Sequence, residues 1–570
     1  MKLAALDFET RAIGPWPNDA PEPVGVAILI EGRKPEYLAW DHPSGSNSTI
    51  ECARERLKDL YSRFEIVAHN AAFDLEVALR RLGLEYPERF HDSQLLAFLA
   101  DPSAKSLGLK ETSDRVLGIA PAERDELREW ILENVSEAAR KPSTWASYIA
   151  QAPANVVAPY ARGDVTRTLA LFNHLHPQII KDGMGAAYLR ELAQIPILAK
   201  MTRVGIPIAR NRLTTAIAGW EAGLDEVERA IRIELGSPAL NLNSGPRLAA
   251  ALQAASKVTK FRRTEKGNRS VSREALAATI ADEKLRNLFT QRIRLNTNLR
   301  FAHPLLELSR ADGRIHCGWN SVPHEQGGAR TGRTTSTHPN LQGAPASMRQ
   351  FIVPEPGAVL LQRDYSQQEL RVLAHYENDT IKEAYLADPR TDFHSLVGAR
   401  ASRILGRELP RRDVKIVVFA TLYGAGNARL ASQLGCPFEE ARVIHNAVFE
   451  AAPGVDSTKR RMEQVQRFET WGGRKYVADR DAAYKNLNYL IQGSAADVTK
   501  MATVRAAAGE LDLRLTIHDA FVSMTEPGVK LKRDMAALRD AMNGVEFPIP
   551  LLSDGAWSER SMGAMREYRD

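Results

Sequence analysis

Two aspartates that lie far apart in the sequence could together bind a pair of metal ions. Asp364 follows the apolar run 358–361, and Asp519 stands between the β-prone runs 513–517 and 521–524. These runs predict buried strands, so each carboxylate should lie at a strand end. Transfer of a nucleotide to a 3′ hydroxyl group suits such a centre, because two Mg²⁺ ions about 3.5–4 Å apart stabilise the attacking and leaving oxygens. An aspartate at a strand end is also a common turn residue, so other residues must support this interpretation.

The segment 410–424 carries cations and aromatic side chains at helical spacing. Two cations and then two aromatic residues recur every four positions: Arg411, Lys415, Phe419 and Tyr423. Pro410 suits the first turn of a helix and Gly424 its end, although the β-branched residues 416–418 favour a strand. On a helix, the cations could hold a triphosphate and the rings could meet a sugar and a base. An amphipathic helix with a solvated basic end and a buried aromatic end is the alternative.

A second group of acidic residues begins near the N-terminus. A short apolar strand ends at Asp7 and Glu9, whose side chains should project to the same side and share a metal ion. Asp74 stands where a strand-like run passes into a helix, and Tyr160 precedes Asp164 by one helical turn. These residues predict a second metal site. The alternative is a set of unrelated surface carboxylates and a core tyrosine.

Five blocks of the sequence resemble those of the family A DNA polymerases, the class of bacterial DNA polymerase I and many phage replicases. In chain order they are Thr331 to Gln342, Asp364 to His375 (motif A), Arg411 to Gly424 (motif B), Asn488 to Asp497 and Ile517 to Asp519 (motif C). The N-terminal acidic motifs resemble the proofreading 3′–5′ exonucleases of the DEDD superfamily. The resemblance implies an α/β multidomain fold, with an RNase H-like exonuclease domain followed by a right-hand polymerase of palm, fingers and thumb.

For the polymerase, the resemblance implies a role for the charged residues of each motif. Asp364 and Asp519 would bind two Mg²⁺ ions, for which Mn²⁺ can substitute, with help from the backbone carbonyl of Tyr365. Arg411 and Lys415 would hold the incoming triphosphate. Lys415 could also protonate the pyrophosphate leaving group.

Other residues would read the sugar and the primer end. Glu369 would crowd the 2′ position of the sugar and reject ribonucleotides, with Tyr423 as its packing partner. Phe419 is the variant associated with discrimination against dideoxynucleotides, and His518 would lie near the primer terminus. The minor groove would be contacted by polar side chains: Arg333, Asn488 and Gln492.

For the exonuclease, the resemblance implies a second pair of Mg²⁺ ions. Asp7, Glu9, Asp74 and Asp164 would bind these ions, and Tyr160 would orient the attacking water. Every residue that the family pattern requires is present in the sequence. An active exonuclease is therefore predicted.

Three positions depart from the family pattern. Ala520 replaces the glutamate that usually follows His-Asp in motif C, so a third carboxylate is expected to be absent. Tyr484 stands where the bacterial enzymes carry an arginine, and Lys485 or Arg480 could substitute for it. Gln368 replaces a usually aliphatic residue of motif A, with no consequence that the sequence reveals.

The length of 570 residues predicts three or four domains. The resemblance assigns residues 1–180 to the exonuclease and 188–330 to the thumb. It assigns 331–400 and 490–570 to the palm, with the fingers at 401–489 between them. The exonuclease motifs begin at the first residues, so we expect no N-terminal 5′ nuclease domain, an arrangement that suits a phage replicase or a trimmed bacterial enzyme.

Charge is unevenly distributed along the chain. The formal net charge is +6, but residues 257–335 hold 16 Lys or Arg against 7 Asp or Glu. A basic segment just before the first polymerase motif suits a surface that follows the phosphates of a duplex. A solvated flexible loop is the alternative for part of this segment.

Composition is that of an ordinary globular protein, with 44% hydrophobic and 26% charged residues. No apolar run approaches the roughly 20 residues of a membrane span, and no secretory leader is recognisable, so we expect no membrane contact and a cytoplasmic location. The cysteines are scattered without metal-ligand spacing, which indicates reduced, inert thiols: Cys52, Cys317 and Cys436.

The sequence therefore predicts a template-directed DNA polymerase with 3′–5′ proofreading, acting on primer-template DNA and deoxynucleotides as a phage-type replicase, with a possible processivity factor or other replisome proteins. A repair or lesion-bypass polymerase of the same fold is one alternative. A catalytically weak DNA-binding accessory protein is another, although a mere binder has no need of paired acids that repel phosphates. An RNA polymerase on the same palm is a third, and Glu369 argues against it.

Overall fold

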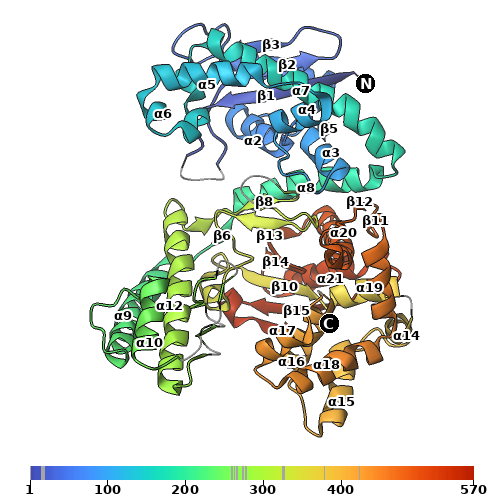
Figure 1. Cartoon of the computed structure of the whole chain (residues 1–570). Coiled ribbons are helices and arrows are strands. Elements are labelled where there is room, and N and C mark those ends of the chain that lie inside the picture. The colour runs from blue at the N-terminus through green and yellow to red at the C-terminus, as the bar shows by residue number, and fades with distance from the viewer. Residues whose placement is uncertain are drawn as a thin grey trace.

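An N-terminal α/β unit lies above a larger unit in the view of Figure 1. In the larger unit, helices α9 (Arg210–Glu234) and α12 (Glu283–Leu308) stand on one side of strand β10 (Val359–Tyr365), and helices α15 (Phe393–Leu405) and α18 (Phe438–Ala451) on the other. The computed structural model describes residues 2–569 apart from a set of gaps: 15–18, 259–260, 262, 265–266, 273–274, 277–278, 324–327, 378 and 423.

The N-terminal unit is built on a mixed sheet. Its elements are β1 (Leu3–Thr10), β2 (Pro23–Ile30), β3 (Glu36–Ala39), α1 (Ile50–Arg63), β4 (Glu65–Ala68), α2 (Ala71–Leu82), β5 (Phe90–Asp92), α3 (Ser93–Ala100), α4 (Leu109–Leu117), α5 (Ala122–Asn134), α6 (Ser136–Arg140), the 3₁₀ segment Pro142–Gln151 and α7 (Ala154–Lys181). The strand order is β3-β2-β1-β4-β5, and β1 pairs antiparallel with β2 and parallel with β4. Successive residues of β1 face opposite cores, because Ala5 packs with residues of α7 and Leu6 with residues of α1.

Helix α8 (Gly185–Val204) joins the two units through buried charge pairs. Lys500 Nζ lies 2.5 Å from Glu191 Oε2, and Arg190 Nη2 lies 2.7 Å from Asp497 Oδ1. Both partners on the C-terminal side belong to helix α20 (Asn486–Ala508). Since removing one member of a buried pair leaves an uncompensated charge, these pairs hold α8 firmly on the larger unit.

The C-terminal sheet (strands β10 and β13–β16) lies at the centre of the larger unit. Its strand order is β13-β14-β10-β15-β16, and every pair is antiparallel. Helix α21 (Val529–Asn543) packs against β10, and both join a core that includes Val359, Leu361 and Met535. The remaining strands are β13 (Asp512–Ile517), β14 (Ala520–Thr525), β15 (Ser553–Ser558) and β16 (Arg566–Tyr568), with the 3₁₀ segment Met562–Ala564 before β16.

Helices inserted between β10 and β13 form the part that carries motif B. The segment 411–422 is helix α16, so the helix prediction is confirmed over the strand propensity of its β-branched residues. Val414, Val417 and Val418 are buried, which explains that override, because tertiary packing outweighs local propensity. The other elements are α13 (Gln368–Glu377), α14 (Thr380–Ala387), α17 (Asn427–Leu434), α19 (Gly454–Gln464), β11 (Arg467–Glu469), β12 (Lys475–Val477) and the 3₁₀ turn Ala483–Lys485.

The helices α9 and α12, on the side of β10 away from α15 and α18, are long and pack on one another. Helix α8 ends at Val204, the short strand β6 (Ile206–Pro207) follows, and α9 then pairs with α12. Further elements here are α10 (Gly245–Ala254), β7 (Arg314–Ile315), β8 (Gly318–Asn320), β9 (Thr335–Thr337) and the 3₁₀ segment Ala346–Phe351. Among the described residues, no helix has the length and apolar character needed to cross a membrane.

Candidate active sites

Motif A and motif C meet at one end of the C-terminal sheet. Asp364 is the last but one residue of β10, and Asp519 lies in the turn between β13 and β14, as predicted. His518 adopts φ 58° in this tight turn, and the backbone N–H of Tyr365 points to the Asp519 carbonyl at 3.4 Å. The sequence prediction that the two carboxylates converge is thus realised by antiparallel pairing of β10 with β14.

Lost hydration is the main influence on the pKa of both acids. The pKa of Asp364 is raised to about 7, first by loss of hydration and then by the neighbouring Asp519 carboxylate, while Lys415 opposes the shift. Burial likewise raises the pKa of Asp519. Two carboxylates that repel each other at a strand end are suited to a divalent cation, because the ion removes the repulsion and offers the hard charge that carboxylate oxygens prefer.

Helix α16 presents the predicted cations on its open side. Arg411 and Lys415 are exposed, and Arg411 Nε lies 2.8 Å from Asp392 Oδ2. Phe419 is half-buried, with Lys415 Nζ 5.8 Å from its ring centroid and the His394 ring at 5.7 Å. The buried aromatic end of the alternative interpretation is therefore not found at Phe419. Tyr423 lies outside the described residues.

Glu369 and Arg333 form an ion pair with each other. The family resemblance implies a separate role for each of them. Arg333 follows Gly332, whose φ of +74° and close approach to the Arg474 guanidinium leave no room for a Cβ atom. The Glu369 charge raises the pKa of Asp519 and the Arg333 charge lowers it, so the pair lies within electrostatic reach of Asp519.

The other residues predicted to contact the primer end lie on α20 and in the motif C turn. Asn488 and Gln492 are one helical turn apart on α20 and both are half-buried, while His518 is exposed. Arg333 and His518 line a common small hollow beside α20. The structure therefore brings Arg333 close to His518, and Asn488 and Gln492 share one face of the helix that borders this hollow.

Two of the departures from the family pattern have local explanations. The buried Gln368 amide donates to Ala495 O at 3.3 Å and to Thr499 Oγ1 at 3.0 Å, so this residue ties α13 to α20. Tyr484 is exposed and packs on Gly424, with Lys485 Nζ 5.7 Å from its ring centroid. An aromatic surface with a cation above it thus occupies the place of the expected arginine.

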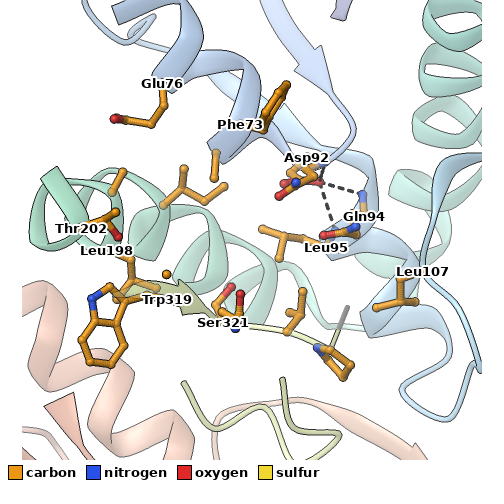
Figure 2. A pocket seen from close by; sticks show the side chains of 18 of the residues that line it. Phe73, Glu76, Asp92, Gln94, Leu95, Leu107, Leu198, Thr202, Trp319 and Ser321 are labelled. Carbon is orange, nitrogen blue, oxygen red and sulfur yellow. Dashed lines mark hydrogen bonds between the residues drawn. The ribbon is translucent and has the colours of Figure 1, made fainter. Parts of the chain in front are cut away.

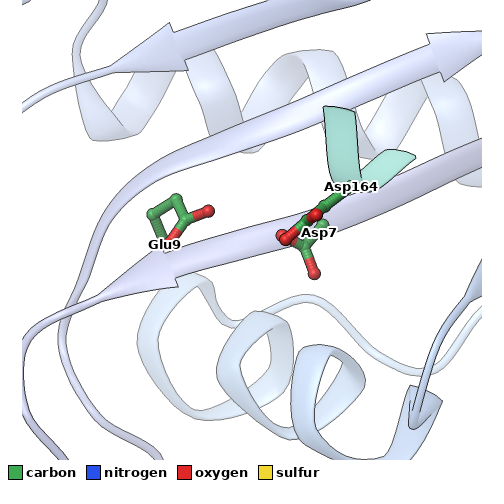
Figure 3. A group of neighbouring side chains, drawn as sticks. All are labelled: Asp7, Glu9 and Asp164. Carbon is green, nitrogen blue, oxygen red and sulfur yellow. The ribbon is translucent and has the colours of Figure 1, made fainter. Parts of the chain in front are cut away.

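The N-terminal acids come together as predicted. Asp7 and Glu9 project from β1 toward Asp164 on α7, and ligand atoms of these residues all lie within 4.8 Å of one another (Figure 3). Asp74, at the start of α2, is buried beside them and accepts a hydrogen bond from Phe8 N at 2.9 Å. Tyr160 lies one turn before Asp164 on α7.

Burial and mutual repulsion both act on these carboxyl groups. The pKa of Glu9 is raised to about 8, first by burial and then by Asp164, and burial raises the pKa of Asp74 to about 8. Glu9 Oε1 is buried with no hydrogen-bond partner among the described residues. An unsatisfied carboxylate oxygen among raised-pKa acids fits a divalent cation, which would replace the missing hydration.

Lys110 lies in this acidic cluster although no sequence motif marks it. Its buried ammonium forms an ion pair with Asp164 and lies 3.8 Å from the centroid of the Tyr160 ring. It stands in the first turn of α4, with no neighbouring motif residue. A lone lysine carries no periodic signal, so only its contacts in the folded chain reveal it.

A cavity of about 620 Å³ lies between the N-terminal unit and the larger unit. Figure 2 shows Phe73, Asp92 and Leu95 on one side, with Leu198 of α8 and Trp319 of β8 across from them. Asp92 accepts from the backbone N–H of Gln94 at 2.7 Å, which fixes the start of α3. Phe73 is adjacent to Asp74 in the chain, so this cavity reaches the helix that carries one of the metal-site acids.

Comparison with known proteins assigns a family model to each of the two units. Residues 210–561 match the family model described as DNA polymerase family A, and residues 3–180 match the model described as 3'-5' exonuclease. The chain belongs to DNA polymerase family A. The predicted α/β fold with an exonuclease domain before a family A polymerase is thereby confirmed, whereas the boundaries of thumb, palm and fingers stay predictions.

Relatives of this family A chain are bacterial and viral. DNA polymerase I of Chloroflexus aurantiacus is 29% identical over 98% of this chain and 62% of the relative, and the thermostable DNA polymerase I of Thermus aquaticus is 29% identical over 94% and 62%. The DNA-directed DNA polymerase of Pseudomonas phage M6 is 27% identical over 96% and 92%. The chain thus spans about three fifths of the length of these bacterial relatives and most of the phage polymerase.

A solved structure shares the fold of this family A chain. The POL domain of Pol1 from M. smegmatis, in a complex with DNA primer-template and dNTP, superposes with a TM-score of 0.80 at 22% identity. The match covers 98% of this chain and 95% of that one. Nearly the whole chain, including the N-terminal unit, therefore shares the fold of that structure.

Proposed function

We propose that this chain is a template-directed DNA polymerase that adds deoxynucleotides to a primer 3′ end and removes terminal nucleotides in the 3′–5′ direction. The observation that carries the proposal is the convergence of Asp364 and Asp519 at one end of the C-terminal sheet, within electrostatic reach of Lys415. The family membership supports the same activity. The match over nearly the full length of a phage polymerase favours a phage-type replicase.

In polymerisation, Asp364, Asp519 and the carbonyl of Tyr365 would hold two Mg²⁺ ions, with Mn²⁺ as a substitute. When bound, such ions stabilise the negative charge that develops on the attacking and leaving oxygens. Lys415 and Arg411 sit on the open side of α16, where they bind and orient the triphosphate of the incoming nucleotide. Lys415 then donates its Nζ proton to the pyrophosphate leaving group.

Selection of the nucleotide and of the primer end rests on the residues around this centre. Glu369 excludes a 2′ hydroxyl by occupying the space beside the sugar, and Arg333 holds its carboxylate in place. When DNA binds, Arg333, Asn488 and Gln492 contact the minor groove of the terminal base pair. Phe419 has no hydroxyl with which to compensate for a missing 3′ hydroxyl, so it disfavours dideoxynucleotides.

In the exonuclease, the acidic cluster would hold a second pair of Mg²⁺ ions. Tyr160 orients the attacking water, and its ring is itself fixed by Lys110 and by an edge contact with Trp145 at 6.2 Å. Lys110 neutralises part of the charge on Asp164 before a cation binds.

A labelled primer on a longer DNA template tests both activities in one gel. With Mg²⁺ and four deoxynucleotides we expect extension to the template end, and omission of one deoxynucleotide should stop synthesis at the complementary template base. Without nucleotides the primer should shorten. Extension that ignores the template sequence, or no reaction in either direction, would contradict the proposal.

A further inference from the structure

Strand β10 has a neighbour on each side at the position of Asp364. Asp364 stands opposite Ala520 on β14 and opposite Asp554 on β15. Directly opposed residues of antiparallel strands project to the same face of a sheet, so Ala520 and Asp554 flank Asp364 on one face. The methyl group of Ala520 occupies the side where the motif C pattern usually has a glutamate. The Asp554 carboxylate lies on the other side of Asp364, on strand β15.

The Asp554 side chain is exposed and available for an ion. Its carboxylate accepts a hydrogen bond from the Ser366 hydroxyl, in the segment that follows β10. Because Asp364 pairs with both Ala520 and Asp554, and Asp519 directly precedes Ala520, the three carboxylates lie at a single end of the sheet.

Buried contacts fix the register that brings Asp554 to this position. The Arg363 guanidinium, on the opposite face of β10, donates to Ser553 Oγ at 3.1 Å and to Ser553 O at 2.8 Å. The Ser553 hydroxyl also lies 2.8 Å from Asn543 Oδ1 of α21, and Ser366 N donates to Leu552 O at 2.8 Å. A slip of one residue would turn Asp554 to the other face, and these contacts prevent it.

We propose that Asp554 is a metal-site carboxylate of the polymerase centre, supplied by β15 in place of the glutamate that motif C lacks. The inference rests on the proposed function, because it concerns the same pair of ions. Mg²⁺ keeps several of its waters in protein sites, so a carboxylate beside Asp364 can hold the ion through one of these waters as well as directly. The loss of a charge at position 520 is thus compensated across the central strand.

Mn²⁺ binding to the free protein gives the direct test. The background is the Asp7→Ala/Glu9→Ala variant, in which two of the four exonuclease acids are removed. Free Mn²⁺ is followed by electron paramagnetic resonance. Asp554→Asn should weaken the Mn²⁺ affinity by about tenfold, the scale on which supporting groups affect metal sites. Adding Ala520→Glu to Asp554→Asn should restore it, because the carboxylate returns on the β14 side of Asp364.

Two controls separate the carboxylate from its surroundings. Glu567→Gln removes an exposed carboxylate of the adjacent strand β16 and should leave Mn²⁺ affinity unchanged. Ser366→Ala removes the hydroxyl contact but keeps the Asp554 charge, and should also leave it unchanged. The inference is overturned if Asp554→Asn binds Mn²⁺ like Glu567→Gln, or if Ser366→Ala loses as much affinity as Asp554→Asn.

Failure of the inference differs from failure of the proposed function. If Asp364→Ala loses Mn²⁺ affinity and primer extension while Asp554→Asn keeps both, the polymerase stands and the role of Asp554 is overturned. If the unchanged chain neither extends a primer nor loses Mn²⁺ affinity on Asp364→Ala, the proposed function is overturned and this inference with it.

Discussion

The two acidic centres of this chain differ in how their charge is balanced. Glu9, Asp74 and Asp164 are buried, and Lys110 from the same unit is paired with Asp164. At the polymerase centre, Asp364 is exposed, and the compensating Lys415 belongs to a separate helix. A cluster that is buried before any ion arrives must have its charge reduced by an internal cation or by protonation of its acids. A centre that receives ions and a triphosphate together can stay open, because the substrate helps to complete it.

The largest expected effect separates the two centres. Asp364→Ala should lower primer extension by at least about 10³-fold, equivalent to roughly 4 kcal/mol of lost transition-state stabilisation, and leave primer shortening intact. Asp7→Ala/Glu9→Ala should do the reverse. Initial rates on labelled primer-template, with and without deoxynucleotides, measure both. If either variant lost both activities, the centres would not be independent.

Removal of the internal cation should affect the exonuclease alone. Lys110→Gln leaves Asp164 and its acidic neighbours without their paired charge and removes the cation from the Tyr160 ring. We expect primer shortening to slow by about 10–100-fold, the range for groups that support metal ligands, with extension unchanged. Lys58→Gln, which alters an exposed lysine of α1, is the matched control. Equal rates of primer shortening for the two variants would show that the Lys110 charge does not support the exonuclease reaction.

The buried acids should make the exonuclease unit less stable as pH rises in the absence of metal. The pKa of Glu9 and that of Asp74 are each raised to about 8, so the folded state binds their protons more tightly than the unfolded chain does. The stability they contribute is complete below about pH 4 and is lost as pH rises through 8.

Melting curves in EDTA should therefore shift downward between pH 5 and 9, by about 2–4 °C for each kcal/mol lost. Mg²⁺ should reverse the shift, because it binds the ionised carboxylates. Glu9→Gln, which cannot ionise at this position, should flatten the pH dependence. A melting temperature that is independent of pH and Mg²⁺ would argue against charge repulsion in the folded cluster.

The smallest expected effect concerns the open centre. Phe419→Tyr places a hydroxyl at the half-buried ring position near Lys415, where it can compensate for a missing 3′ hydroxyl. One added hydrogen bond of about 1 kcal/mol should raise dideoxynucleotide incorporation severalfold. Termination ladders at fixed ratios of dideoxynucleotide to deoxynucleotide measure this ratio. Ladders identical to those of the parent chain would contradict the role of Phe419 in discrimination against dideoxynucleotides.

Local sequence patterns were sufficient for the elements that carry both centres. The apolar run before Asp364, the hairpin at Asp519 and the helical spacing of Tyr160 and Asp164 each depend on neighbours within a few residues, and each is found as predicted. At 411–422, β propensity favours a strand and residue spacing favours a helix. The segment is a helix because its valines pack into the core while its cations face out.

What the sequence by itself determined is the placement of the motif acids at strand ends and on helical turns, since these positions depend on local geometry. The tertiary structure decided their counter-charges and partners: Lys110 on Asp164, Arg333 on Glu369, and Asp554 beside Asp364. These partners join segments tens to nearly two hundred residues apart. No local period records such pairs, because they arise only when strand register and helix packing bring distant charges into contact.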